Sequence, residues 1–126
     1  MKSAPKITVN ETGKLVTFDY RGHITAAGIQ AHLDQIRALG EKVSPPFTIV
    51  ADLTDLEHME PECAPVLSRI MEQLSGMGVA WIVRVIPDPR KDIGLAILSL
   101  FHYKAEIRIN TVPSRKEAGR LLGPAR

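Results

Sequence analysis

The sequence predicts one α/β domain, spanning residues 1–126, in which helices flank a mostly parallel β-sheet. Two observations lead to this fold class. The length fits a single domain, because domains most often have about 100–150 residues. After an initial pair of strand-like segments, apolar strands alternate with segments of helical periodicity, which is typical of right-handed crossovers between parallel strands. The expected order is β-β-α-β-α-β-α-β-α, with an antiparallel first strand.

The first half of the chain begins with a predicted hairpin. Residues 7–9 and 14–20 have strand character, and Gly13 between them provides the positive φ that a tight turn needs. Thr25 is placed to cap a first helix. The apolar residues of that helix recur at helical spacing: Ile29, Leu33, Ile36, Leu39 and Val43. Residues 47–53 are almost continuously apolar, which indicates a strand buried on both faces.

The second half repeats the alternation of helix and strand. Pro61 fits the first turn of a second helix, which Gly76 and Gly78 are expected to end. Residues 79–86 form the strongest predicted strand, and residues 88–103 are predicted to form a third helix that begins with Asp-Pro. A short strand is expected at 106–109. Ser114 and Glu117 have the spacing of a capping box for the last helix.

Composition argues against several classes of protein. The net charge is only +2 with acids and bases interspersed, whereas nucleic-acid binding usually requires a concentrated basic surface. Cys63 is the single cysteine, so no intrachain disulfide forms and a reducing compartment is expected. The N-terminus lacks the apolar stretch of a signal peptide. The longest apolar run, residues 93–101, is too short for a helix that crosses a membrane, which needs roughly 20 apolar residues. We therefore expect a cytoplasmic protein without stable membrane insertion.

Residues 49–63 carry a resemblance to a known family. The predicted buried strand ends in Asp52, Leu53 and Thr54, and a short bend leads to Met59 and Glu60 before the second helix. This segment resembles the centre of a STAS domain (sulfate transporter and anti-sigma factor antagonist), and residues 21–25 and 76–83 are also similar to that family. The resemblance implies the SpoIIAA-like fold. It also implies a bacterial signal-transduction module that binds an anti-sigma factor or another regulatory protein.

The sequence departs from the family at one functionally important position. In anti-sigma factor antagonists a serine at the start of the second helix is phosphorylated, whereas this chain has Pro61 there. Proline cannot accept phosphate, so the usual phospho-switch is expected to be absent. Glu60 and Glu62 remain at the predicted helix start, where negative charge is stabilised by the helix dipole. They either present a permanent charge to a partner or serve only to stabilise the helix.

Two surfaces are candidates for binding a partner. One is the start of the second helix with the bend before it, and the other is the third helix, which is apolar on nearly all sides. The third helix is either buried, covered by a partner or a second copy of the chain, or itself the cover of a small apolar or lipid-like ligand. The predicted partner-binding residues are Glu57, His58, Glu60, Pro61, Glu62, Arg90, Ile97 and Phe101.

The sequence offers little support for an enzyme or a cofactor. Open α/β sheets bind ligands at the ends of their strands, and five acidic residues gather near the end of the buried strand: Asp52, Asp55, Glu57, Glu60 and Glu62. Their spacing does not match the Asp-x-Asp phosphatase signature. The four histidines have no metal-ligand spacing: His23, His32, His58 and His102. A helix start can activate a thiol, yet we expect Cys63 to be a small buried residue. The sequence therefore favours a non-enzymatic binding protein.

Overall fold

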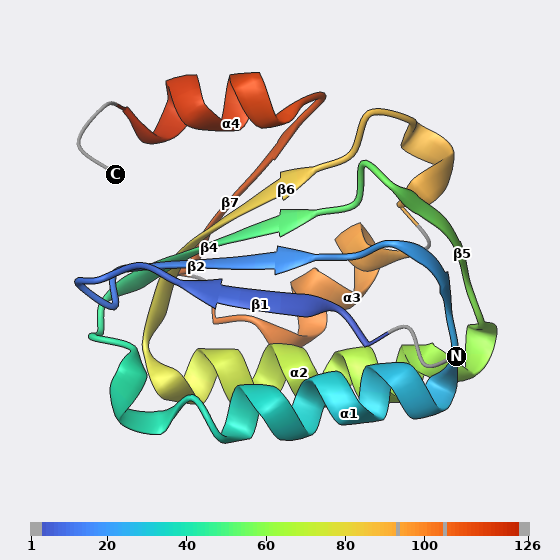
Figure 1. The fold of residues 1–126 in the computed structure, drawn as a ribbon, viewed down its shortest axis with the longest axis horizontal. Helices are drawn as coiled ribbons and strands as arrows, with labels where there is room; N and C mark the ends of the chain where they lie inside the picture. The colour runs from blue at the N-terminus through green and yellow to red at the C-terminus, as the bar shows by residue number, and fades with distance from the viewer. Residues whose placement is uncertain (1–3, 93, 105, 124–126) are drawn as a thin grey trace.

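The main sheet has five strands in the order β1-β2-β4-β6-β7. In the computed structural model, which describes residues 4–92, 94–104 and 106–123, β1 is antiparallel to β2 and the other neighbours are parallel (Figure 1). The strands are β1 (Lys6–Val9), β2 (Leu15–Asp19), β4 (Phe47–Asp52), β6 (Val79–Val85) and β7 (Arg108–Val112). The predicted α/β class with a mostly parallel sheet is confirmed.

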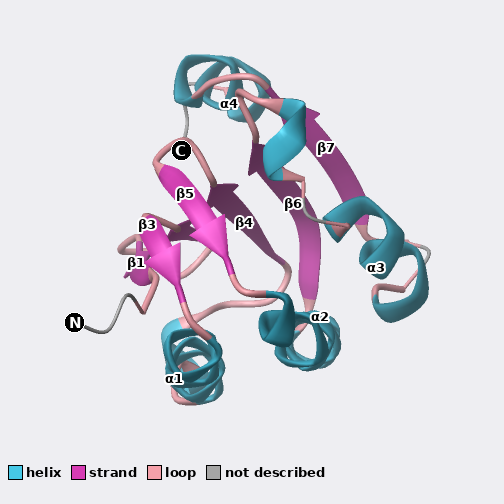
Figure 2. Ribbon diagram, turned by 90° about the vertical axis from the view of Figure 1, so that its right-hand side faces the viewer, coloured by secondary structure: helices cyan, strands magenta, loops and turns pink. Residues whose placement is uncertain are grey.

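The helices lie on both faces of this sheet. Figures 1 and 2 show α1 (Ala26–Arg37), α2 (Ala64–Met77) and α3 (Leu95–His102) on one side and α4 (Arg115–Leu122) on the other. The larger core lies on the side of α1 and α2 and includes Phe18, Leu33 and Ile49, each at most 1% exposed. A smaller core under α4 includes Val83 and Leu122. Both sheet faces are thus covered, as the apolar strands 47–53 and 79–86 predict.

The predicted turn and caps form through local hydrogen bonds. Gly13 has a φ of 72° in the β1–β2 turn. Thr25 Oγ1 accepts a hydrogen bond of 3.0 Å from Gly28 N at the start of α1, and Ser114 Oγ accepts one of 3.1 Å from Glu117 N at the start of α4. Each cap satisfies a backbone amide that has no partner within its helix.

Two short strands, β3 (Gly22–Ile24) and β5 (Leu56–Met59), replace the loops expected before the first helix and after the buried strand. They pair in parallel and form a separate two-stranded sheet at one end of the main sheet (Figure 2). Each is only three or four residues long, and its middle residues are exposed, so neither shows a strand-like apolar alternation. Only the pairing between distant segments makes them strands.

The predicted third helix is interrupted. Residues 89–91 form an isolated 3₁₀ turn, η3 (Pro89–Lys91), in which Asp88 Oδ1 accepts a hydrogen bond of 3.0 Å from Arg90 N. Gly94 then adopts a φ of 84°, a left-handed conformation that cannot continue a right-handed helix, and α3 starts only at Leu95. The last strand also lies later than expected, at Arg108–Val112 instead of 106–109.

The second helix starts with a 3₁₀ turn, η2 (Pro61–Cys63), that leads directly into α2. Gly76 lies within α2, and Gly78, with a φ of 98°, ends it. In the described parts of the chain, no helix has the length and apolar character needed to cross a membrane.

Candidate functional site

The two-stranded sheet and η2 bring most of the predicted partner-binding residues to one end of the fold. Leu56 and Met59 anchor β5 in the core, while Glu57 and His58 between them are exposed. The His58 ring lies 4.8 Å from the ring of His23 in the neighbouring β3. We call the exposed residues of β5 and η2, namely Glu57, His58, Pro61 and Glu62, the β5–η2 surface.

Glu60 acts on a different helix from the one expected. Its carboxylate accepts a hydrogen bond of 3.1 Å from Ala26 N, in the first turn of α1, and lies 3.4 Å from His23 Nε2. The hydrogen bond from Ala26, followed by the contact with His23, lowers the pKa of Glu60 below its usual value. The side chain therefore joins the β5 end to the start of α1, where the helix dipole stabilises negative charge. Substitution of Glu60 would perturb this junction as well as any surface for a partner.

Cys63 is a packing residue. Its side chain is fully buried, and its Sγ lies 3.8 Å from the carbonyl oxygen of Ile24. Burial, followed by the negative charge of Glu60, raises the pKa of the thiol. A raised pKa leaves little reactive thiolate near neutral pH, in agreement with the expected role as a small buried residue.

The other three predicted residues lie on later elements. Arg90 is in η3, which packs beside β5. Its side chain is 90% exposed, and its guanidinium pairs with Asp88 at 2.9 Å. Ile97 lies on α3 and is 64% exposed. The side chain of Phe101 lies outside the described residues. The structure thus places Arg90 near the β5–η2 surface and Ile97 on a separate element.

The acidic residues near the end of β4 do not converge. Asp52 is 4% exposed, and Thr54 donates hydrogen bonds to its Oδ1 from both N and Oγ1. Its Oδ2 pairs with Arg115 at 3.0 Å, so both oxygens are held by the protein itself. In the described ranges, no three His, Cys, Asp or Glu side chains lie together as metal ligands would. The geometry assigns Asp52 to a structural link between β4 and α4.

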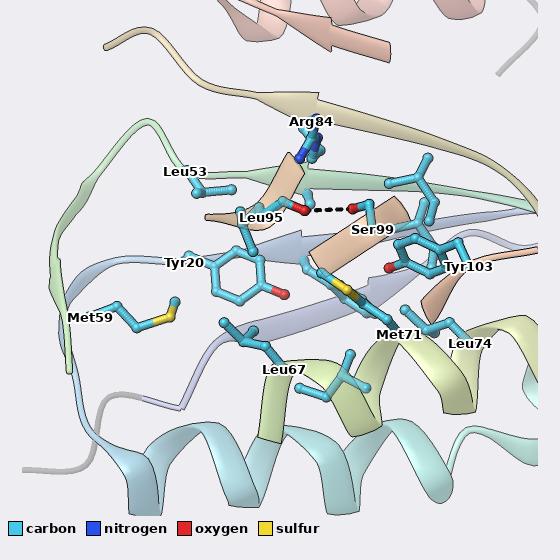
Figure 3. A pocket seen from close by; sticks show the side chains of 15 residues that line it. Tyr20, Leu53, Met59, Leu67, Met71, Leu74, Arg84, Leu95, Ser99 and Tyr103 are labelled. Atoms are coloured by element: carbon cyan, nitrogen blue, oxygen red, sulfur yellow. Dashed lines mark hydrogen bonds between the residues drawn. The ribbon is translucent and has the colours of Figure 1, made fainter. Parts of the chain in front are cut away.

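An apolar cavity of about 50 Å³ lies between the sheet, α2 and α3 (Figure 3). Its walls come from β2, β4 and β6 above, from α2 below, and from Leu95, Ser99 and Tyr103 around α3. In Figure 3 the rings of Tyr20 and Tyr103 lie on either side of Met71. The volume exceeds what one water molecule needs but is well below the roughly 300 Å³ of a typical ligand pocket.

Arg84 is the one charged residue among the described residues that line the cavity. Its Nε and Nη1 are inaccessible to solvent and have no hydrogen-bond partner in the described parts of the protein. Arg84 and Tyr103 both line the cavity. Burial raises the pKa of Tyr103, and the positive charge of Arg84 partly opposes that rise. Sequence patterns did not mark Arg84, because one arginine within a strand has no distinctive spacing.

No protein-family model and no curated protein sequence matches this chain. Solved structures, however, share its fold. The anti-sigma factor antagonist SpoIIAA in its unphosphorylated form is 14% identical, with a TM-score of 0.63 over 96% of this chain and 100% of that one. The phosphorylated form of SpoIIAA from Bacillus gives 16% identity and a TM-score of 0.62, covering 95% and 100% of the two chains.

A third similar structure comes from Shewanella loihica. It is an uncharacterised protein of the DUF3478 family with a SpoIIAA-like fold, 13% identical, with a TM-score of 0.64 over 95% of this chain and 93% of that one. Similarity at this level of identity establishes the architecture. The chain therefore has the SpoIIAA-like fold that residues 49–63 led us to expect.

Proposed function

We propose that this chain is a non-enzymatic regulatory module that binds a protein partner through the β5–η2 surface. The observation that carries the proposal is the exposure of Glu57, Pro61 and Glu62 at one end of the fold. Neither Glu57 nor Glu62 forms a hydrogen bond or ion pair with another described residue. Charged side chains without an internal role, next to a rigid proline turn, are available for contacts with another molecule.

The fold adds support for a regulatory role. SpoIIAA, which shares it, is an anti-sigma factor antagonist. An anti-sigma factor or another regulatory protein is the class of partner that we propose, and a second copy of the chain is the alternative occupant of the surface. Cys63 is free and buried, which fits the reducing conditions of the cytoplasm.

We further propose that phosphorylation at the start of α2 does not control this module, because Pro61 occupies the position of the family's serine. Within residues 52–68 the hydroxyl groups belong to Thr54 and Ser68. Thr54 Oγ1 is hydrogen-bonded to buried Asp52, and Ser68 Oγ donates to Ala64 O at 3.3 Å. Phosphopeptide mapping of protein from its native host is expected to find residues 52–68 unmodified. A phosphate on Thr54 or Ser68 would refute this part of the proposal.

Reversing a charge on the β5–η2 surface is expected to weaken partner binding about tenfold or more. Glu62 is exposed and without a partner among the described residues, so Glu62→Lys changes the surface potential and leaves the packing intact. Like charges brought together at an interface disfavour association. The measurement is quantitative affinity capture from host extract, with Glu11→Lys in the β1–β2 turn as the matched control.

Glu11 is equally exposed and lies in the hairpin turn, away from β5 and η2. A protein retained by the wild type and by Glu11→Lys, but lost with Glu62→Lys, supports the proposed surface. Equal retention by both variants contradicts it. Unchanged melting temperatures would show that both variants are folded.

The cavity favours a second function, the binding of a small apolar molecule. It is almost wholly apolar and lies beneath the short helix α3 (Figure 3). Ligand sites in proteins are concave and mainly apolar, with few polar groups. A titration calorimetry experiment with 1-octanol tests this second function directly, since octanol is apolar, neutral and small.

A further inference from the structure

Arg84 occupies an unfavourable position for a charged side chain. It lies in β6, in the middle of the sheet, with Ala51 of β4 and Thr111 of β7 beside it in register. Its side chain is on the cavity side, where two of its nitrogen atoms are buried without a hydrogen-bond partner among the described residues. Polar nitrogen atoms removed from water normally have a hydrogen-bond partner, because desolvation without one is unfavourable.

The walls of the cavity do not supply that partner. None of the described residues that line it is acidic. Asp52, one position along β4 from the cavity-lining Ala51, is turned to the opposite face of the sheet, where Thr54 and Arg115 hold its oxygens. The chain thus surrounds a guanidinium with apolar groups and with the hydroxyl-bearing side chains of Tyr20, Ser99 and Tyr103.

We propose that this cavity binds a small monocarboxylic acid, with its carboxylate on Arg84 and its apolar tail against α2 and α3. The inference rests on the second function above and defines its ligand class. A carboxylate oxygen accepts strong, charge-assisted hydrogen bonds from a guanidinium nitrogen, which favours this head group for the unpartnered nitrogens of Arg84. One cation without a second basic side chain in the lining balances a single negative charge, which favours a carboxylate over a phosphate dianion.

The tail requires α3 to move outward, because 50 Å³ does not hold a chain of several carbons. Some of the contacts that hold α3 are polar. Ser75 Oγ donates to His102 O at 3.4 Å, and His102 Nδ1 lies 3.2 Å from a carboxylate oxygen of Glu72. Gly94, at a φ of 84° directly before the helix, is a position at which the backbone can turn.

The test compares octanoate, 1-octanol and octyl phosphate by titration calorimetry with the wild type, Arg84→Met and Arg120→Met. Arg120 is a matched control because it is exposed on α4, on the opposite face, and pairs with Glu117. We expect the wild type and Arg120→Met to bind octanoate at least about tenfold more tightly than octanol. In Arg84→Met the dissociation constant for octanoate should rise at least about tenfold, with that for octanol unchanged.

Other outcomes overturn the proposal in distinguishable ways. Equal binding of octanoate and octanol by the wild type, or unchanged binding of octanoate by Arg84→Met, refutes the proposal that the ligand is a carboxylic acid held by Arg84. The apolar-ligand function then stands. Tighter binding of octyl phosphate than of octanoate refutes the choice of a carboxylate as the head group. If the wild type binds none of octanoate, 1-octanol and octyl phosphate, both the carboxylic-acid ligand and the apolar-ligand function are refuted. The β5–η2 proposal is unaffected by that result. Arg84→Met should melt at a temperature no lower than that of the wild type, because it removes two buried nitrogen atoms that have no hydrogen-bond partner among the described residues, and a cooperative transition would show that the variant is folded.

Discussion

Gly13→Ala is expected to lower the free energy of unfolding by about 3 kcal/mol, the sum of backbone strain and a steric clash. Gly13 has a φ of 72°, and a Cβ there would lie 2.6 Å from the carbonyl oxygen of Lys42. The clash is with backbone, so the β1–β2 turn would have to separate from the segment before β4. That separation also weakens the hydrogen bond of 2.9 Å from Ser44 N to Gly13 O.

Urea denaturation of Gly13→Ala and Gly22→Ala separates the two effects. Gly22 has a similar φ of 64°, but a Cβ there meets no atom within 4 Å, so only the strain of about 1 kcal/mol applies. Gly76→Ala, in the last turn of α2 and with no atom within 4 Å of an added Cβ, should stabilise the protein by up to about 1 kcal/mol. Equal losses at positions 13 and 22 would show that the close approach of the turn to Lys42 contributes nothing.

Acidification from pH 7 to pH 5 is expected to lower the free energy of unfolding by about 2 kcal/mol through His32 alone. The His32 ring is fully buried against Phe18 and Tyr20, and its Nε2 lies 3.1 Å from the Tyr20 hydroxyl. Burial lowers the pKa of His32 from 6.5 to about 3. Between these values the unfolded chain binds a proton that the folded protein excludes, so stability is complete above pH 6.5 and falls below it.

The comparison of wild type with His32→Leu isolates this effect, because all the other ionisable side chains are the same in both proteins. The difference in stability between pH 7 and pH 5, from urea denaturation at each pH, should shrink by about 2 kcal/mol in His32→Leu. Tyr20→Phe, which keeps the ring beside His32, should retain the full difference. An identical pH dependence of wild type and His32→Leu would show that the buried ring is protonated in the folded state.

Local signals in the sequence were sufficient to predict much of the architecture. Thr25 and Ser114 each cap a helix through a hydrogen bond to a residue three positions later. The turn at Gly13 is likewise closed locally, by the hydrogen bond from Gly13 N to Asn10 O. The determinants of these features therefore lie close together in the sequence. Residues 47–53 and 79–86 are apolar enough to identify them as central strands. The break before α3 was not predicted. The third helix was predicted from its apolar residues, whereas the left-handed conformation of Gly94 determines where the helix begins.

Features that depend on distant contacts were not predictable. The pairing of β3 with β5 brings Glu60 to the first turn of α1, and the hydrogen bond of 3.0 Å from Glu60 N to Ile24 O stabilises that arrangement. From the sequence, Glu60 was expected to belong to the start of its own helix. Arg84 shows the same difficulty, because only the fold determines which face of β6 it occupies and that the face encloses a cavity.

The most direct test of the proposed function is site-specific photo-crosslinking in the native host. A benzophenone amino acid replaces Glu62 on the β5–η2 surface, and the control carries it at Glu11. We predict one discrete cross-linked species from position 62 and none from position 11. Its mass distinguishes a regulatory protein from a second copy of this 13.9 kDa chain. No cross-linked species at position 62, or the same species from both positions, would contradict the account.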